Sequence, residues 1–168
     1  SEQWRTLCFA LCFLHCTVIE RLKFGALGWS ANYAFGDRDL KCSLNFLERH
    51  LRESALSWPA VQFMVAEVLL GGLVTDTFDR RTLAAYTKGW LSARTLAPSF
   101  SFCEGSEAFC VPRAAAMSTT YLDSIAKFPE VDPPQVLGVH PHAELIDDGA
   151  HVIRALSQRP PPHLGDDA

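Results

Sequence analysis

The chain has 168 residues, of which 48% are hydrophobic and 20% charged, and its formal net charge is −4. This composition is typical of a globular protein with a substantial core and excludes an intrinsically disordered chain. Lysine and arginine are scattered and form no dense basic run, so neither nucleic acid nor a strongly charged molecule is expected as a partner.

The first predicted element is an unusually apolar helix over about residues 4–24. Its main apolar stripe consists of Trp4, Leu7, Leu11, Leu14, Val18 and Leu22. A helix that is apolar on all sides is normally central or covered by another domain, so we expect poor solubility or self-association of the isolated chain. The run at 7–19 is too short to cross a bilayer, so no membrane partner is expected. Charged residues follow it where a signal peptide would have its cleavage site, which disfavours a signal peptide.

Three cysteines recur every four residues within this helix. Cys8, Cys12 and Cys16 are therefore expected on one buried helical face, where free cysteine behaves as a small hydrophobe. Other features of a disulfide-rich secreted scaffold are missing, which favours a reduced protein. Cys12 and His15 do not complete a tetrahedral site, so no metal is expected and His15 should pair with a neighbour. Adjacent helical side chains diverge, which also argues against Cys16 and His15 as a nucleophile and base.

Two glycines and three aromatic residues follow the helix. Gly25 and Gly28 are expected to end it, because glycine adopts the left-handed conformation without steric cost. Trp29, Tyr33 and Phe35 lie in the next loop. Aromatic residues in a loop indicate that it packs against the helices and does not extend into solvent.

Two helices with regular apolar spacing are predicted next. Asp37 is a suitable N-cap for the first of them. Its apolar positions are Leu40, Leu44, Leu47 and Leu51. The second begins at Trp58 with Pro59 in its first turn, where a missing N–H costs little, and it ends at Gly71 and Gly72.

Charged residues cluster around a fourth predicted helix, which is capped by Thr75 or Asp76 and runs to about residue 91. The cluster consists of Glu67, Asp76, Asp79, Arg80 and Arg81. Carboxylates in a first turn suit the positive end of the helix dipole, and the arginines are placed to pair with Glu67 or Asp76. Two interpretations stay open: a capped helix with solvated charges, or arginines that brace a domain interface.

The sequence changes character after residue 97. Two β-prone segments at 100–103 and 108–111 predict a hairpin that leans on the helices. A disulfide between Cys103 and Cys110 is geometrically conceivable, but a reducing compartment would leave it open. A short helix at 119–128, a turn at 134–139, a weak helix at 147–156 and a disordered proline-rich tail at 159–168 follow. The expected divisions are 1–97, 98–146 and 147–168.

The signatures of nucleotide and hydrolase chemistry are missing from the sequence. It contains no GxxxxGK[ST], GxGxxG, HExxH or GxSxG pattern, so this chain is not expected to hydrolyse ATP or hold a cofactor by itself. His140 and His142 lack a plausible third ligand. We therefore expect no catalytic residue and no metal site.

Three segments carry a family resemblance. They are ERLKFGALGWSANYAFGDRDL at 20–40, GGLVTDTFDRR at 71–81 and PPQVLGVH at 133–140. In this order and spacing they resemble the C-terminal end of a dynein heavy chain. The resemblance implies a mainly α fold, with the helical lid of the last AAA+ module followed by the start of the C-terminal region.

The resemblance also implies a role and a place. The chain would be a non-catalytic lid that braces the AAA+ ring of an ATP-driven microtubule motor, with ATP and Mg²⁺ in other modules. Implied partners are neighbouring AAA+ modules and, through the whole protein, intermediate and light chains and microtubules. The implied location is the cytoplasm and cytoskeleton, in a cilium or flagellum axoneme. The candidates for holding loops and interfaces together are Trp29, Tyr33, Phe35, Glu67, Gly71, Gly72, Asp76, Asp79, Arg80 and Arg81.

Departures from the family pattern keep two alternatives open. Polar or aromatic family positions are replaced by Leu70, Leu73, Thr77, Phe78, Pro133 and Gln135, and two residues are inserted near 114–117. The whole protein is then either a motor or a divergent dynein-like scaffold without motor activity. A third interpretation, from another class of protein, is a self-standing all-α module that binds a partner helix.

Overall fold

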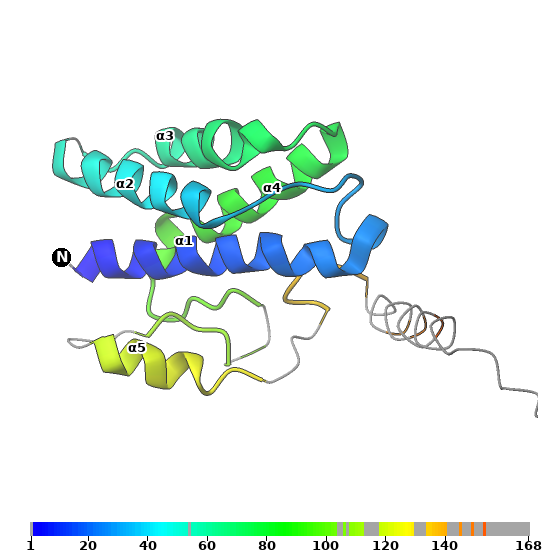
Figure 1. Cartoon of the computed structure of the whole chain (residues 1–168). Helices are drawn as coiled ribbons and strands as arrows, with labels where there is room; N and C mark the ends of the chain where they lie inside the picture. Colours follow the sequence, from blue (N-terminus) through cyan, green and yellow to red (C-terminus); the bar gives the residue numbers. More distant parts are fainter. Residues whose placement is uncertain are drawn as a thin grey trace, which may run out of the picture.

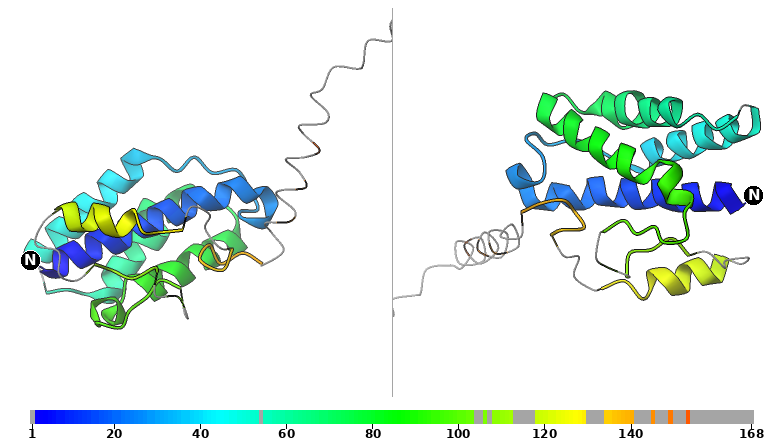
Figure 2. Two further views of the ribbon diagram at one scale, coloured as in Figure 1. Left: turned by 90° about the horizontal axis from the view of Figure 1, so that it is seen from below. Right: turned by 180° about the vertical axis from the view of Figure 1, so that it is seen from behind.

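The computed structural model describes residues 2–53, 55–103, 106, 108–112, 118–129, 134–140 and the single residues 145, 149 and 153. Helix α1 (Glu2–Glu20) lies in the middle of the molecule (Figure 1). Helices α2, α3 and α4 lie on one side of it, and an irregular segment and α5 lie on the other; Figure 2 shows the same arrangement from behind. The predicted mainly α fold is confirmed.

The apolar stripe of α1 forms the centre of the core. Leu7, Leu11, Leu14 and Val18 are each at most 1% exposed and belong to one hydrophobic cluster that draws on both sides of α1. The prediction of a central helix is thus confirmed. No helix within the described part of the chain is long and apolar enough to cross a membrane.

Gly25 and Gly28, the two glycines after α1, are required for different structural reasons. The helix continues as η1 (Arg21–Leu27), two 3₁₀ pieces that meet at a kink at Gly25, where a φ of +51° and a ψ of −129° are non-helical. Gly28 has a φ of −86°, so the prediction of a left-handed residue is wrong there. A Cβ at Gly28 would lie 1.8 Å from the carbonyl oxygen of Arg21. Gly28 is therefore needed for a close backbone approach.

Helix α2 (Asp37–Glu53) begins one position differently from the prediction. Asp37 is its first helical residue and does not cap it. Gly36 precedes the helix, and its N–H donates to the carboxylate of Asp39 at 2.9 Å. This is half of a capping box, in which a side chain in the first turn reaches back to the N-cap backbone.

The predicted third helix consists of three pieces. These are α3 (Trp58–Phe63), the π-helical η2 (Met64–Leu69) and the 3₁₀ turn η3 (Gly71–Leu73). Pro59 lies in the first turn as predicted. A Cβ at Gly71 would lie 1.6 Å from the carbonyl oxygen of Ala66, whereas one at Gly72 would meet nothing within 4 Å. Only Gly71 is sterically required at this end. Helix α4 (Thr77–Trp90) follows.

The predicted hairpin is wrong. After the 3₁₀ turn η4 (Ala93–Leu96), the described residues contain no strand. They contain a single antiparallel bridge between Ser101 and Cys110, and the N–H of Phe102 donates to Phe109 at 2.9 Å. Phe102 stacks on Phe13 with ring centroids 4.1 Å apart. The aromatic residues that gave the segment its β propensity are used to fill the core instead.

A short helix and a tight turn complete the described chain. Helix α5 (Ser118–Ile125) matches the short helix that was predicted. The predicted turn is also present: in the C-terminal turn (residues 134–139), the N–H of Val139 donates to Pro134 at 3.0 Å. Gly138 has a φ of +58°. Several predictions lie outside the described residues: the tail, the insertion and the residues Pro133 and His142. The predicted weak helix at 147–156 also does, apart from positions 149 and 153. The three expected divisions stay a prediction.

Candidate functional site

The loop at 28–36, here called the aromatic loop, packs onto the bundle as predicted. Trp29 and Tyr33 are only 2% and 6% exposed, and Phe35 is half-buried. Their three rings contact one another, with centroids 5.7 to 5.8 Å apart. The indole N–H of Trp29 donates to the carbonyl of Val18 at 2.9 Å, which fixes the loop to the end of α1.

A buried carboxylate, which we call the Asp79 clasp, holds the middle of the aromatic loop. Asp79 lies in the first turn of α4 and is 5% exposed. It accepts hydrogen bonds from the N–H and the hydroxyl of Ser30, at 2.9 and 3.1 Å, and from the hydroxyl of Tyr33 at 2.7 Å. These donors compensate the burial of its charge. Burial and the hydrogen bond to Asp79 raise the pKa of Tyr33.

The start of α4 is capped by Asp76. Its carboxylate accepts from the N–H groups of Phe78 and Asp79, at 2.7 and 3.1 Å, so Asp76 and not Thr75 is the N-cap. The N–H of Asp76 donates to the hydroxyl of Tyr33 at 3.2 Å. The helix start and the aromatic loop therefore share one hydrogen-bond network.

His15 holds the far end of the aromatic loop. It is 3% exposed, and its Nε2 lies 3.0 Å from the carbonyl oxygen of Gly36. This contact confirms that His15 is paired with a neighbour. Among the described residues, no group of three or more His, Cys, Asp or Glu side chains is arranged to hold a metal ion.

A second buried contact, the Arg21 clasp, joins α4 to the C-terminal turn. The guanidinium of Arg21, a residue 5% exposed, donates to the hydroxyl of Tyr86 at 2.9 Å and to the carbonyls of Leu137 and Gly28. It lies over the rings of Trp29 and Tyr86, at 5.0 and 5.6 Å from their centroids. No carboxylate of the described residues pairs with it. Cation–π contacts and carbonyls replace an acid partner.

Sequence reasoning missed the Arg21 clasp. Tyr86 donates to the same Leu137 carbonyl, and burial raises its pKa although Arg21 opposes that shift. A signal was present, because Arg21 follows Leu14 and Val18 at helical spacing on the apolar stripe. A charged residue on such a stripe points to a buried polar contact.

The remaining candidates lie on the surface. Glu67, Arg80 and Arg81 are exposed. Arg80 donates to the carbonyl of Val74 at 2.8 Å, and Arg81 lies over the ring of Phe78 at 5.6 Å. In the described part of the chain, neither arginine forms an ion pair with Glu67 or Asp76, so the predicted pairing is wrong. The carboxylate of Asp76 is instead used by backbone N–H groups.

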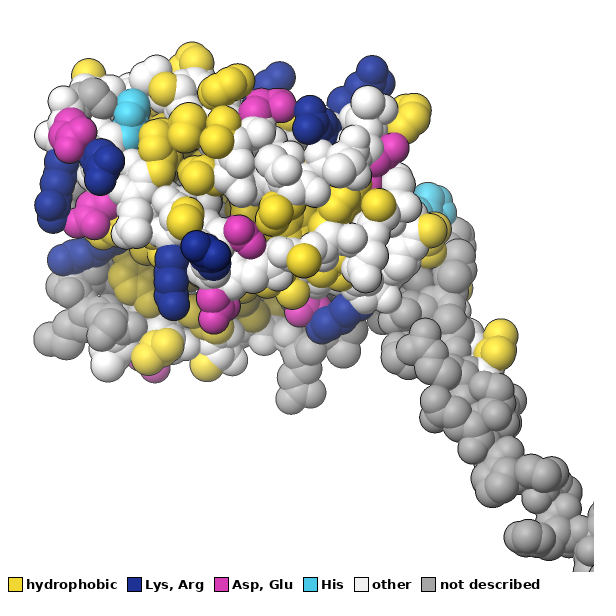
Figure 3. All heavy atoms as spheres, turned by 45° about the horizontal axis from the view of Figure 1, so that its top comes forward, with side chains coloured by type: hydrophobic (Ala, Val, Ile, Leu, Met, Phe, Trp, Pro, Cys, Tyr) yellow, Lys and Arg dark blue, Asp and Glu magenta, His cyan; other side chains and the backbone are white. Residues whose placement is uncertain are grey.

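The site thus divides into an interior and a surface. One network connects the buried Trp29, Tyr33 and Asp79 with the half-buried Phe35 and Asp76, and the buried Gly71 begins η3. Figure 3 shows acidic and basic side chains interspersed with apolar ones on the face seen there. The buried network is suited to fixing the relative position of helices.

Comparison with known proteins identifies the family. Residues 4–143 match the family model described as the dynein heavy chain AAA lid domain. The chain belongs to this family. It is 37% identical over 149 residues to dynein axonemal heavy chain 5 of Mus musculus and 38% identical over 146 residues to dynein axonemal heavy chain 8 of Homo sapiens. It is 27% identical over 157 residues to the dynein gamma chain, flagellar outer arm, of Chlamydomonas reinhardtii.

These matches cover most of this AAA lid but little of the relatives. They include 86%, 84% and 86% of the chain, and 3% of each relative's length. The resemblance inferred from the three sequence segments is confirmed. All three segments lie within the matched residues, and Trp29, Tyr33 and Asp79 join the first segment to the second in space.

Proposed function

We propose that this AAA lid is a non-catalytic brace of the AAA+ ring in an ATP-driven microtubule motor. Its relatives include axonemal and flagellar dynein chains, which supports an axonemal location in a cilium or flagellum. ATP and Mg²⁺ would bind in other modules of the whole protein. Its direct partners would be neighbouring AAA+ modules, and the whole protein would engage intermediate and light chains and microtubules.

The observation that carries the proposal is the set of large apolar side chains exposed on α3, η2, η3 and α4. We call it the 63–81 surface. Its large exposed apolar side chains are Phe63, Val68, Leu73 and Phe78, at 59%, 46%, 37% and 70% exposure. The exposed Glu67, Arg80 and Arg81 lie among them in the sequence. Exposed apolar residues mixed with arginine are typical of protein–protein contacts. We infer that this surface meets a neighbouring AAA+ module.

The interior supports a mechanical role. The Asp79 clasp fixes the aromatic loop to α4, and the Arg21 clasp fixes α4 to the C-terminal turn. Movement of a neighbouring module would therefore shift the lid as one body, because packed helices transmit displacement without deforming. Coupling of this kind requires only that the lid stays folded and keeps its contacts.

The test is made in the full-length protein. Phe63→Asp combined with Phe78→Asp places two charges on the 63–81 surface. Leu122→Asp is the matched control, because Leu122 is 64% exposed on α5, away from that surface. We expect the double variant to reduce microtubule-stimulated ATPase activity at least tenfold and the control to keep it. Equal activity of both variants would contradict the proposed interface. Urea unfolding of the isolated chain should give the same midpoint for all variants.

The microtubule-stimulated ATPase assay also distinguishes a motor from a divergent dynein-like scaffold without motor activity. Leu70, which stands at one of the replaced family positions, is 1% exposed and belongs to the hydrophobic core. If the folded wild-type parent shows no microtubule-stimulated turnover, the divergent scaffold is favoured and the lid still braces a ring. ATP hydrolysis by the 168-residue chain alone would overturn the non-catalytic assignment. A parent without AAA+ cores would indicate the self-standing interaction module.

A further inference from the structure

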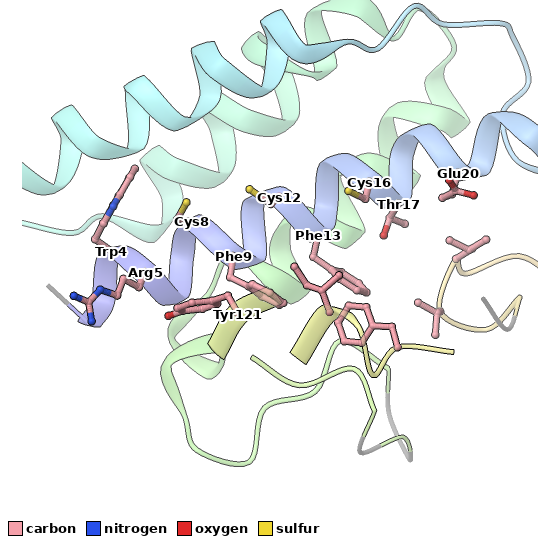
Figure 4. Close-up of a pocket in the computed structure, with 14 residues that line it drawn as sticks. Trp4, Arg5, Cys8, Phe9, Cys12, Phe13, Cys16, Thr17, Glu20 and Tyr121 are labelled. Carbon is pink, nitrogen blue, oxygen red and sulfur yellow. The ribbon is translucent and has the colours of Figure 1, made fainter. Parts of the chain in front are cut away.

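A cavity of about 420 Å³ lies between α1, α5 and the C-terminal turn (Figure 4). Its walls are mainly aromatic and aliphatic, with Trp4, Phe9 and Phe13 from α1 and Tyr121, Ile125 and Phe128 from the opposite side. Its volume and apolar lining fall within the range of small-molecule sites. It borders the Arg21 clasp at Leu137, whose carbonyl accepts from Arg21, but it shares no lining residue with the Asp79 clasp or the 63–81 surface.

Three thiols line the same cavity. Figure 4 shows Cys8, Cys12 and Cys16 in a row along α1, with Phe9 and Phe13 on the side nearer α5. Cys8 and Cys12 are half-buried and Cys16 is exposed, so the prediction that all three are buried core residues is wrong. Periodicity placed them on one face, but α5 covers that face only in part.

Cys8 has the properties of a reactive thiol. A hydrogen bond from Cys12 lowers the pKa of Cys8 to about 7, while the same contact and burial raise the pKa of Cys12. The thiolate is the nucleophilic form of cysteine. Cys8 is therefore more readily ionised than an ordinary cysteine, and it lies at the wall of an apolar cavity with Cys12 one helical turn away.

We propose that Cys8 is a modification site for soft electrophiles with an apolar chain, and that medium-chain α,β-unsaturated aldehydes are the class that fits. The Sγ of Cys8 forms a bond to the β-carbon, and the electron pair of the carbon–carbon double bond moves toward the carbonyl. The resulting enolate takes one proton at the α-carbon, from Cys12 or water. The net reaction adds a thiol across a double bond, so no oxidant, reductant or leaving group is required. The alkyl chain occupies the cavity and the aldehyde remains at its mouth.

The test uses chain length as the variable. The full chain is treated with trans-2-nonenal or trans-2-pentenal, the adducts are reduced with borohydride, and peptide mass spectrometry measures the rate at each cysteine. Cys42 is the internal reference, because it is exposed on α2 and does not line the cavity. We expect nonenal to modify Cys8 at least tenfold faster than Cys42, since each buried methylene contributes roughly fourfold to binding. Pentenal should show much less preference.

Variants assign that preference to the cavity and the thiol pair. Ile125→Asp places a charge in the α5 wall and should remove the preference for nonenal, whereas Leu122→Asp, on the same helix but outside the cavity, should keep it. Cys12→Ala should shift the pH–rate profile of Cys8 toward higher pH, and Cys12→Ser should shift it less because a hydroxyl still donates. Equal rates at Cys8 and Cys42 with nonenal would overturn the proposal. So would a preference for nonenal that survives in folded Ile125→Asp.

Discussion

Removal of the Asp79 carboxylate is the sharpest test of the buried network. In Asp79→Ala, the hydroxyl of Tyr33 and the N–H of Ser30 lose acceptors at 2.7 and 2.9 Å. The hydroxyl of Tyr33 remains in a residue that is 6% exposed. Asp76 still caps α4 through its own hydrogen bonds, so the helix itself should persist.

The expected loss of stability follows from these two contacts. A hydrogen bond to a charged group contributes about 1.5–3 kcal/mol, so two of them give about 3–6 kcal/mol. Ser30 is exposed, so its N–H can form a hydrogen bond with water in the variant. The expected loss of unfolding free energy is therefore near the lower end, at about 3 kcal/mol. This is a large share of the roughly 5–15 kcal/mol that stabilises a typical domain.

Urea unfolding followed by circular dichroism measures this loss. Asp123→Ala is the matched control, because Asp123 is an exposed aspartate on α5 and its removal should change stability by less than about 0.5 kcal/mol. A double-mutant cycle of Tyr33→Phe with Asp79→Ala should give a coupling of about 1.5–3 kcal/mol. The reasoning is refuted if Asp79→Ala and Asp123→Ala unfold at the same urea concentration or if the coupling is zero.

Three further outcomes follow from the structure. Gly71→Ala should destabilise by about 3 kcal/mol or more because its Cβ meets a backbone oxygen, whereas Gly72→Ala should change the thermal midpoint little; equal midpoints would contradict this. Arg21→Lys should speed hydrogen exchange in the C-terminal turn nearly as much as Arg21→Met, because a lysine cannot reproduce the guanidinium fork. The raised pKa values of Tyr33 and Tyr86 favour their neutral forms in the folded state. Stability should therefore fall as pH rises above the ordinary value of 10.0, and less steeply in Tyr33→Phe, in urea titrations across that range.

Local signals were sufficient to locate the helices, although not the three-part form of the third or the cap of α2. The spacing of Leu7, Leu11 and Leu14 predicted the central helix, and the adjacent Thr75 and Asp76 predicted the start of α4, although not which of the two is the N-cap. Such features depend on contacts between residues three or four positions apart. The position of Pro59 in the first turn of α3 is of the same kind.

Tertiary contacts were not accessible from these patterns. Asp79 was placed in a first helical turn, and solvation of its charge was one of two interpretations left open, but it is buried and bonded to Ser30 and Tyr33, which lie 49 and 46 residues earlier in the chain. Gly28 was expected to need a positive φ, but it is fixed by a backbone approach to Arg21. The environment of Asp79 is set by residues distant in sequence, and that of Gly28 by the way the backbone folds back on itself. Neither can be read from the spacing of neighbouring residues.

Trp29 connects the two clasps into one network. Its ring lies 5.0 Å from the guanidinium of Arg21 and 5.8 Å from the ring of Tyr33, which donates to Asp79. The changes in unfolding free energy caused by two substitutions add within about 0.5 kcal/mol when the two residues share no partner, but not when they share one. We therefore expect Arg21→Met and Asp79→Ala to be non-additive by more than about 0.5 kcal/mol in urea unfolding, and additive once Trp29→Ala is introduced. Additivity in the presence of Trp29 would show that the clasps act independently. The C-terminal turn and α4 would then be coupled by the direct contacts of Arg21 and Tyr86 with Leu137, and not through the aromatic loop.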